Sequence, residues 1–366
     1  MQILRGAAAA LGATMAMAVL AVAALATAGL PVTWPFVATV LAAAFGGPAT
    51  LTGSLDAGAM GAVLHGTVDI APLALSAVGA LIFSVTLQGH VGTPMPVYAR
   101  RVLGAAAMLL IVLAAVVAAP DATMAVTVPA GPASASQDAQ LVIRPDTGAT
   151  LISGLLGFTV LTGGGALLTL LPHRRIAARA ALTGLATPIA AGVAIAAVVA
   201  TQRPSLAGVA LLFGGNAAML AGPSSITLGG PLADRLDPNY QLPDAAAGAL
   251  AVPLILAAFV LATVPPGDGN RWQRAGRRAL VAGAVLAVVF AALSLAGAGR
   301  LSLGLMVLIL NAELLTVQLV PAIGWAALAG AAGGGLAGLL GSLMADMRRT
   351  GGGDRASHAA PAVGGR

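Results

Sequence analysis

The chain contains no cysteine and no lysine, and it has few aromatic residues and few charges of either sign. Without cysteine, disulfides, thiol nucleophiles and cysteine-ligated metals are excluded. Charged residues make up only 8% of the 366 residues, against roughly 25% in an average soluble domain. Hydrophobic residues make up 58% and the mean hydropathy is +0.96. The composition therefore predicts an integral membrane protein whose main partners are membrane lipids.

The formal net charge of +6 comes from arginines gathered in short runs between apolar stretches. Basic residues beside membrane spans remain preferentially on the cytoplasmic side. This tendency explains the arginines better than binding to nucleic acid does, so we predict no nucleic-acid partner.

Long apolar runs dominate the chain. A helix needs about 20 apolar residues to cross a hydrocarbon core of about 30 Å. Continuous apolar runs favour helices over the alternating strands of a membrane barrel. The predicted fold class is therefore an all-α polytopic membrane helix bundle over residues 1–348. Its roughly eight crossing helices are expected near residues 7–29, 70–87, 102–119, 149–171, 180–200, 245–264, 279–299 and 322–344.

Three further apolar segments, 35–45, 206–222 and 301–320, leave two alternatives open. Each either crosses the membrane or is re-entrant or interfacial. If none crosses, every arginine cluster falls on the side of Arg5, as the positive-inside rule requires. We therefore expect non-crossing segments and cytoplasmic N- and C-termini. The arginines predicted to determine this topology are Arg100, Arg101, Arg174, Arg175, Arg179, Arg271, Arg274, Arg277, Arg278, Arg348 and Arg349.

The remaining sequence is expected to form outer loops and a tail. The loops are 48–69, 120–148 and 223–244, of which 120–148 is compatible with a small β-hairpin. Residues 349–366 are predicted to be a disordered cytoplasmic tail. The first apolar run, which ends near Ala26 and Ala28, resembles a cleavable secretory signal, but its length favours an uncleaved anchor.

A span followed by a non-crossing apolar segment and a second span occurs three times in this interpretation. The stretch Phe45-Gly46-Gly47-Pro48-Ala49 is also similar to Phe213-Gly214-Gly215-Asn216-Ala217. Together these features suggest an internal repeat, which is common among membrane transporters.

Four polar residues in apolar segments form a speculative substrate or proton pathway. Glu313 is the strongest candidate, because an intramembrane carboxylate costs about 2.5–3.5 kcal/mol and is usually functional. Asn311 and Gln318 would share one face of a helix, and Asn216 follows two glycines where a broken helix could expose its backbone. The alternatives are an interfacial position for Glu313 and ordinary interhelical contacts for the three amides.

Gly330, Gly334 and Gly338 form a ridge of small residues suited to helix packing, within the chain or in a homo-oligomer. The four histidines have no metal-ligand spacing, and no catalytic or nucleotide-binding motif stands out. We therefore predict no cofactor, no metal site and no enzymatic activity.

The chain resembles the streptophobe family of very hydrophobic bacterial membrane proteins. The resemblance rests on Asp69-Ile-Ala-Pro72-Leu73, with Gly79-Ala80 following, on Arg100-Arg101, and on the segment from Gly208 to Asn216. It implies a multi-pass membrane protein and carries over no catalytic residues.

Three functions remain open. We favour a structural or interaction component of the bacterial cell membrane, with envelope proteins or a second copy as partners. A transporter or permease-like protein with broken helices around Asn216 and Glu313 is the alternative. A lipid-acting enzyme using outer acidic residues such as Asp56 and Asp69 is the least favoured.

Overall fold

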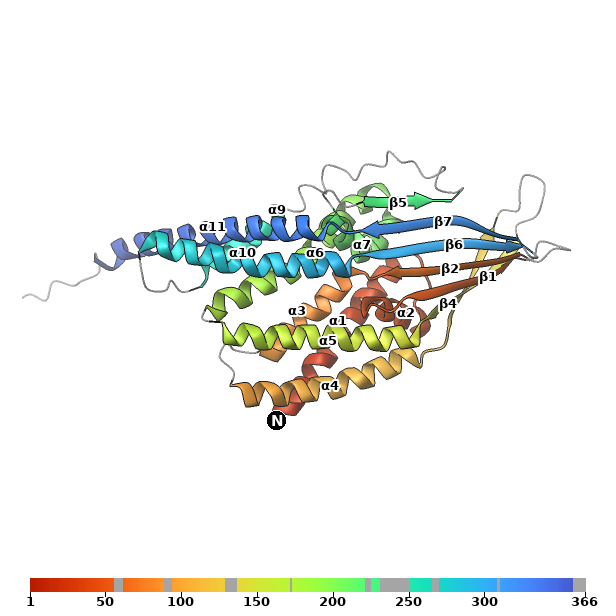
Figure 1. The fold of residues 1–366 in the computed structure, drawn as a ribbon, viewed down its shortest axis with the longest axis horizontal. Coiled ribbons are helices and arrows are strands. Elements are labelled where there is room, and N and C mark those ends of the chain that lie inside the picture. Colours follow the sequence, from red (N-terminus) through yellow and green to blue (C-terminus); the bar gives the residue numbers. More distant parts are fainter. Residues whose placement is uncertain are drawn as a thin grey trace, which may run out of the picture.

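The computed structural model describes residues 1–55, 62–88, 94–128, 137–171, 173–220, 225–230, 251–264, 270–307 and 310–357. It combines a bundle of long helices with one β-sheet that extends beyond the bundle at one end (Figure 1). The chain passes repeatedly between the two parts, so helices and strands alternate along the sequence.

Six helices in the described residues are long and apolar enough to cross a membrane, which makes the chain a multi-pass membrane protein. Their length follows from long runs of apolar and small residues, mainly alanine, leucine, valine and glycine. In a helix most backbone groups bond to each other, as hydrocarbon requires. They are α1 (Gln2–Thr27), α4 (Met95–Val117), α5 (Thr147–Leu170), α6 (Arg174–Gln202), α10 (Arg271–Ala296) and α11 (Ile323–Ser357), the last apolar over Ile323–Met347.

The described residues also contain four shorter α-helices and one 3₁₀ turn. Two of them, α2 and α7, occupy the segments 35–45 and 206–222 that were expected not to cross, and α3 and α9 occupy two of the expected spans. The bounds are α2 (Trp34–Ala44), α3 (Leu73–Gln88), η1 (Pro204–Leu206), α7 (Ala207–Leu220) and α9 (Ala251–Ala262).

Seven described strands form a single sheet in which every neighbouring pair is antiparallel, in the order β3-β4-β1-β2-β6-β7-β5. The strands are β1 (Ala49–Leu55), β2 (Ala62–Ile70), β3 (Ala122–Val128), β4 (Gln137–Pro145), β5 (Ser225–Gly229), β6 (Gly299–Val307) and β7 (Leu310–Val320). The sheet holds most of the expected outer loops 48–69 and 120–148, and β5 lies in the third, 223–244. Residues 120–148, where the sequence allows a small hairpin, contribute two strands to this larger structure.

The prediction of an apolar re-entrant segment at 301–320 is wrong, because these residues form the β6–β7 hairpin. The physical reason is visible in β6, where Arg300 and Ser302 alternate with Leu301, Leu303 and Leu305. This period of two matches a strand with one polar face.

The sheet as a whole has one polar and one apolar face. Asp69 and Thr67 share a face of β2, and Ser302 lies opposite Thr67 on β6, with their hydroxyl oxygens 2.7 Å apart. Val68 of β2 and its partner Leu301 of β6 lie on the other face. Asp69 and Thr67 are exposed, whereas Val68 and Leu301 are half-buried. The polar face is therefore the one turned to water.

The order of elements occurs twice along the chain. Residues 2–170 form the first half, with the order helix, short helix, hairpin, two helices, hairpin, helix. The described part of the second half, 174–357, repeats this order, with β5 in place of the first hairpin and without a described counterpart of β2. The strand order repeats too, since β3-β4-β1 corresponds to β6-β7-β5. Both halves have the same orientation, as in proteins built from parallel repeats.

The repeat thus occurs twice rather than three times. The two glycine motifs that suggested it do not occupy equivalent positions in the two halves. Phe45 is the C-cap of α2, whereas Phe213 lies within α7. A better correspondence joins Gly47-Pro48 before β1 to Gly222-Pro223 before β5.

A buried arginine has the same place in each half. Arg101 of α4 donates to the Leu87 carbonyl at 3.0 Å, and Arg278 of α10 donates to the Val264 carbonyl at 2.7 Å, each acceptor being 14 residues earlier. The two arginines are only 9% and 3% exposed. Each guanidinium lies at the C-terminal end of the preceding helix, where carbonyls lack intrahelical partners and attract a cation.

The ends of the helices place the arginine clusters opposite the sheet (Figure 1). Strands follow the ends of α4 and α10 and precede the starts of α3, α5 and α11, so the starts of α4, α6 and α10 lie at the far end. Arg101 also donates to Gln2 at the start of α1, at 2.8 Å. Arg271 and Arg274 approach Asp346 of α11 at 3.5 and 3.6 Å. The remaining cluster residues there are Arg100, Arg174, Arg175, Arg179 and Arg277, with Arg348 and Arg349 continuing α11.

Candidate functional site

Glu313 lies on β7 of the sheet and is exposed, with Gly304 of β6 opposite it. The premise of a carboxylate inside an apolar membrane segment is therefore wrong. A water-exposed strand position carries none of the desolvation cost that made Glu313 a proton-carrier candidate.

The structure separates the two amides expected near Glu313. Asn311 pairs with Met306 across the β6–β7 hairpin, and its side chain lies outside the described residues. Gln318 lies near the other end of β7, opposite Arg300, and is exposed.

Asn216 is 3% exposed and links α7 to the start of α3. Its Oδ1 accepts a hydrogen bond from the Leu73 amide at 3.0 Å, and its Nδ2 donates to the Ala71 carbonyl at 2.8 Å. The side chain thereby satisfies an amide at the helix start that has no intrahelical acceptor. Gly215 permits the close packing of α7 here, since a Cβ there would lie 2.9 Å from Pro188 of α6 and 3.3 Å from the Ala74 amide nitrogen of α3.

The glycine ridge of α11 lies against α10. A Cβ on Gly330, Gly334 or Gly338 would come within 2.5, 2.6 or 2.8 Å of the α10 backbone. These glycines therefore serve a close contact between two helices of the same chain.

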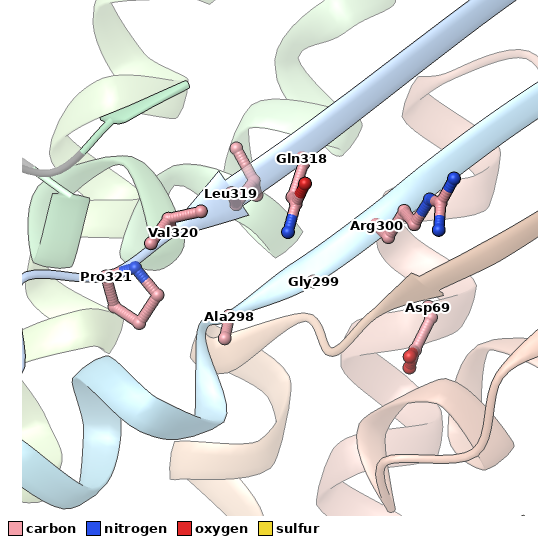
Figure 2. A pocket seen from close by; sticks show the side chains of 8 residues that line it. All are labelled: Asp69, Ala298, Gly299, Arg300, Gln318, Leu319, Val320 and Pro321. Atoms are coloured by element: carbon pink, nitrogen blue, oxygen red, sulfur yellow. The ribbon is translucent and has the colours of Figure 1, made fainter. Parts of the chain in front are cut away.

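One pocket brings Gln318 together with two charged residues that the sequence did not single out as a pair. It has a volume of about 330 Å³. Figure 2 shows Asp69 from β2, Arg300 from β6 and Gln318 from β7 around it. The rest of the lining is small or apolar and consists of Ala298, Gly299, Leu319, Val320 and Pro321.

The register of the sheet sets the spacing of the three polar side chains. Asp69 is the direct partner of Arg300, and Arg300 is the direct partner of Gln318. Direct partners in an antiparallel pair have Cβ atoms about 4.5–5.5 Å apart. All three side chains are exposed, and in the described part of the chain neither charge has an ion-pair partner. The pocket thus presents a carboxylate, a guanidinium and an amide from three neighbouring strands in one row.

A second pair of opposite charges, Arg144 of β4 and Asp121 just before β3, forms a direct ion pair. Arg144 of β4 binds Asp121 through two hydrogen bonds of 2.9 and 2.6 Å. The hydrogen bond from Arg144 holds the pKa of the Asp121 carboxyl below its usual range. Asp69 and Arg300 form no such ion pair, so Arg144 can serve as a control for substitutions of Arg300.

The described residues contain no group of three or more metal-ligating side chains that could hold an ion.

Comparison with known proteins finds no match, since no family model fits the chain and no curated protein or solved structure is significantly similar to it. Asp69 and Arg300 could have been found from the sequence only by recognising the alternation in β2 and β6, which places both on the polar face.

Proposed function

We propose that the protein is an interaction component of a bacterial cell membrane, which displays its β-sheet on the outer side for a partner of the cell envelope. The supporting observation is the exposed polar face of a seven-stranded sheet. That sheet is carried by helices whose opposite end bears the arginines. A sheet held in water by several membrane anchors has a fixed orientation, which suits recognition of another envelope component.

The proposal includes a topology of about eight crossings. To the six long helices it adds α3, which runs from the sheet to the arginine end, and α9, whose C-terminal end lies at the arginine end. The arginine end, and with it both termini, would be cytoplasmic, because positive residues are retained there. Membership in the streptophobe family and the absence of enzymatic activity also stay predictions.

Position-specific photo-crosslinking tests the proposed function. A photoreactive residue at Thr52 or Gln140, both exposed on the polar face, should capture the same protein in intact cells. Matched probes at Leu64 on the apolar face and at Leu156, 63% exposed on α5, should not capture it. An identical pattern from all four positions, or no protein from the polar face, would refute the interaction function.

Transport has less support in this arrangement. Glu313 is exposed on a strand, and both polar atoms of the Asn216 amide are engaged in holding α7 to α3. These were the two residues on which the transport hypothesis depended.

A further inference from the structure

The pocket lies at the level expected for lipid head groups. It is built from residues that directly follow α10 and directly precede α11 and α3. From Ala279, which follows the last arginine of α10, to its end at Ala296, the helix rises about 27 Å, close to a hydrocarbon thickness of about 30 Å. Trp325 in the first turn of α11 is 52% exposed, and exposed tryptophans mark the membrane interface.

The pocket carries one positive and one negative side chain, which complement a zwitterionic ligand. Arg300 offers a guanidinium that suits phosphate oxygens, and Asp69 offers a carboxylate that can accept hydrogen bonds from a primary ammonium. Their Cβ atoms lie about one strand spacing apart, so the two flexible side chains can reach a phosphate and an ammonium that are joined by a short ethylene linker. Gln318 adds an amide beside Arg300 that can donate a further hydrogen bond to the phosphate.

We propose that this pocket binds the head group of a phosphatidylethanolamine-type membrane lipid, with Arg300 on its phosphate and Asp69 on its ammonium. The volume of about 330 Å³ is at the lower end of ligand pockets and suits a head group. Leu319, Val320 and Pro321 supply apolar surface for the glycerol backbone and the first carbons of the chains.

The same chemistry disfavours choline and purely anionic head groups. A choline head group carries a quaternary ammonium with no N–H to donate to Asp69, and a purely anionic head group would be repelled by its carboxylate. The site also lies where the two halves of the chain join, since β2 belongs to the first half and β6 and β7 to the second. Interfaces between repeats are where membrane proteins commonly bind ligands. This inference does not depend on the proposed protein partner.

Native mass spectrometry of the purified full chain, titrated with lipids of identical acyl chains, tests the inference. Phosphatidylethanolamine should bind about 3- to 5-fold more tightly than phosphatidylcholine or phosphatidylglycerol, the range expected for the one exposed charge contact that its ammonium makes with Asp69. Asp69→Asn should remove the preference over phosphatidylcholine, and Arg300→Gln should weaken binding of phosphatidylethanolamine about 3- to 5-fold. Arg144→Gln, on the same face of the sheet, is the matched control and should behave as the wild type.

Water-soluble glycerophosphoethanolamine distinguishes a lipid from a free head group. It should compete poorly at equal concentration, because it lacks the chains that contact the apolar wall. Equal binding of phosphatidylethanolamine and phosphatidylcholine, wild-type behaviour of both pocket variants, an equal effect of Arg144→Gln, or full competition by the soluble head group would each overturn the proposal. Thermal unfolding of each variant verifies that the fold is retained.

Discussion

Replacing Gly334 with alanine should force α10 and α11 apart, whereas the same change at Gly335 should not. A Cβ on Gly334 would lie 2.6 Å from the Ala282 carbonyl oxygen and 2.9 Å from its carbon, both rigid backbone atoms, while nothing lies within 4 Å of a Cβ on Gly335. Relieving the clash needs a shift of several tenths of an ångström along the contact. Overpacking of this kind costs about 1–3 kcal/mol.

The two positions are adjacent on one helix, so the intrinsic gain of about 0.5–1 kcal/mol from replacing a helical glycine with alanine applies to both and cancels in the comparison. The free energy of unfolding of Gly334→Ala should therefore fall about 1–3 kcal/mol below that of Gly335→Ala. Titration of the purified protein with denaturing detergent, followed by circular dichroism, measures the difference. Equal stability of the two variants would refute the close contact between these helices.

Three further predictions concern single polar side chains. Asn216→Ala should lower the free energy of unfolding by about 1–3 kcal/mol, because a buried amide and carbonyl lose their partners, and denaturant titration measures this loss. Because Arg144 lowers the pKa of Asp121, the ion pair should stabilise the sheet above the ordinary aspartate pKa of about 3.9 and lose this effect as the pH falls through the lowered value. In a pH series, the melting temperature of the wild type should exceed that of Arg144→Gln at neutral pH, and the two values should converge in acid. A constant difference at every pH, or none at all, would count against the ion pair. Glu313→Gln should leave stability within about 0.5 kcal/mol of the wild type, because the side chain is an exposed strand residue, and a larger loss in the same denaturant assay would argue for a buried carboxylate.

The long helices could be predicted from the sequence because hydrocarbon imposes a simple requirement of length and polarity. All six long apolar helices of the described residues, α1, α4, α5, α6, α10 and α11, occur near expected runs, and the arginine clusters lie together at one end of the bundle. Hydropathy failed at 301–320, where leucines on one face of a hairpin raise the average as much as a membrane helix does. Only the alternation of side chains distinguishes the two.

The pocket and the buried contacts depend on pairing between distant segments. Asp69 and Arg300 meet because β2 and β6 are neighbours, and no local pattern in either strand predicts that pairing. The same applies to Asn216, whose partners lie more than 140 residues earlier. In contrast, the pairs Arg100-Arg101 and Arg277-Arg278 are visible in the sequence and lie at corresponding places in the two halves.

The central claim is that the sheet and the arginines lie on opposite sides of the membrane, and cysteine labelling tests it most directly. The native chain has no thiol, so Thr52→Cys on β1 and Gln273→Cys between the arginines of α10, both exposed, can be introduced one at a time. A membrane-impermeant maleimide should label Thr52→Cys in intact cells and Gln273→Cys only after the cells are permeabilised. Labelling of Gln273→Cys in intact cells, or protection of Thr52→Cys until permeabilisation, would contradict the account.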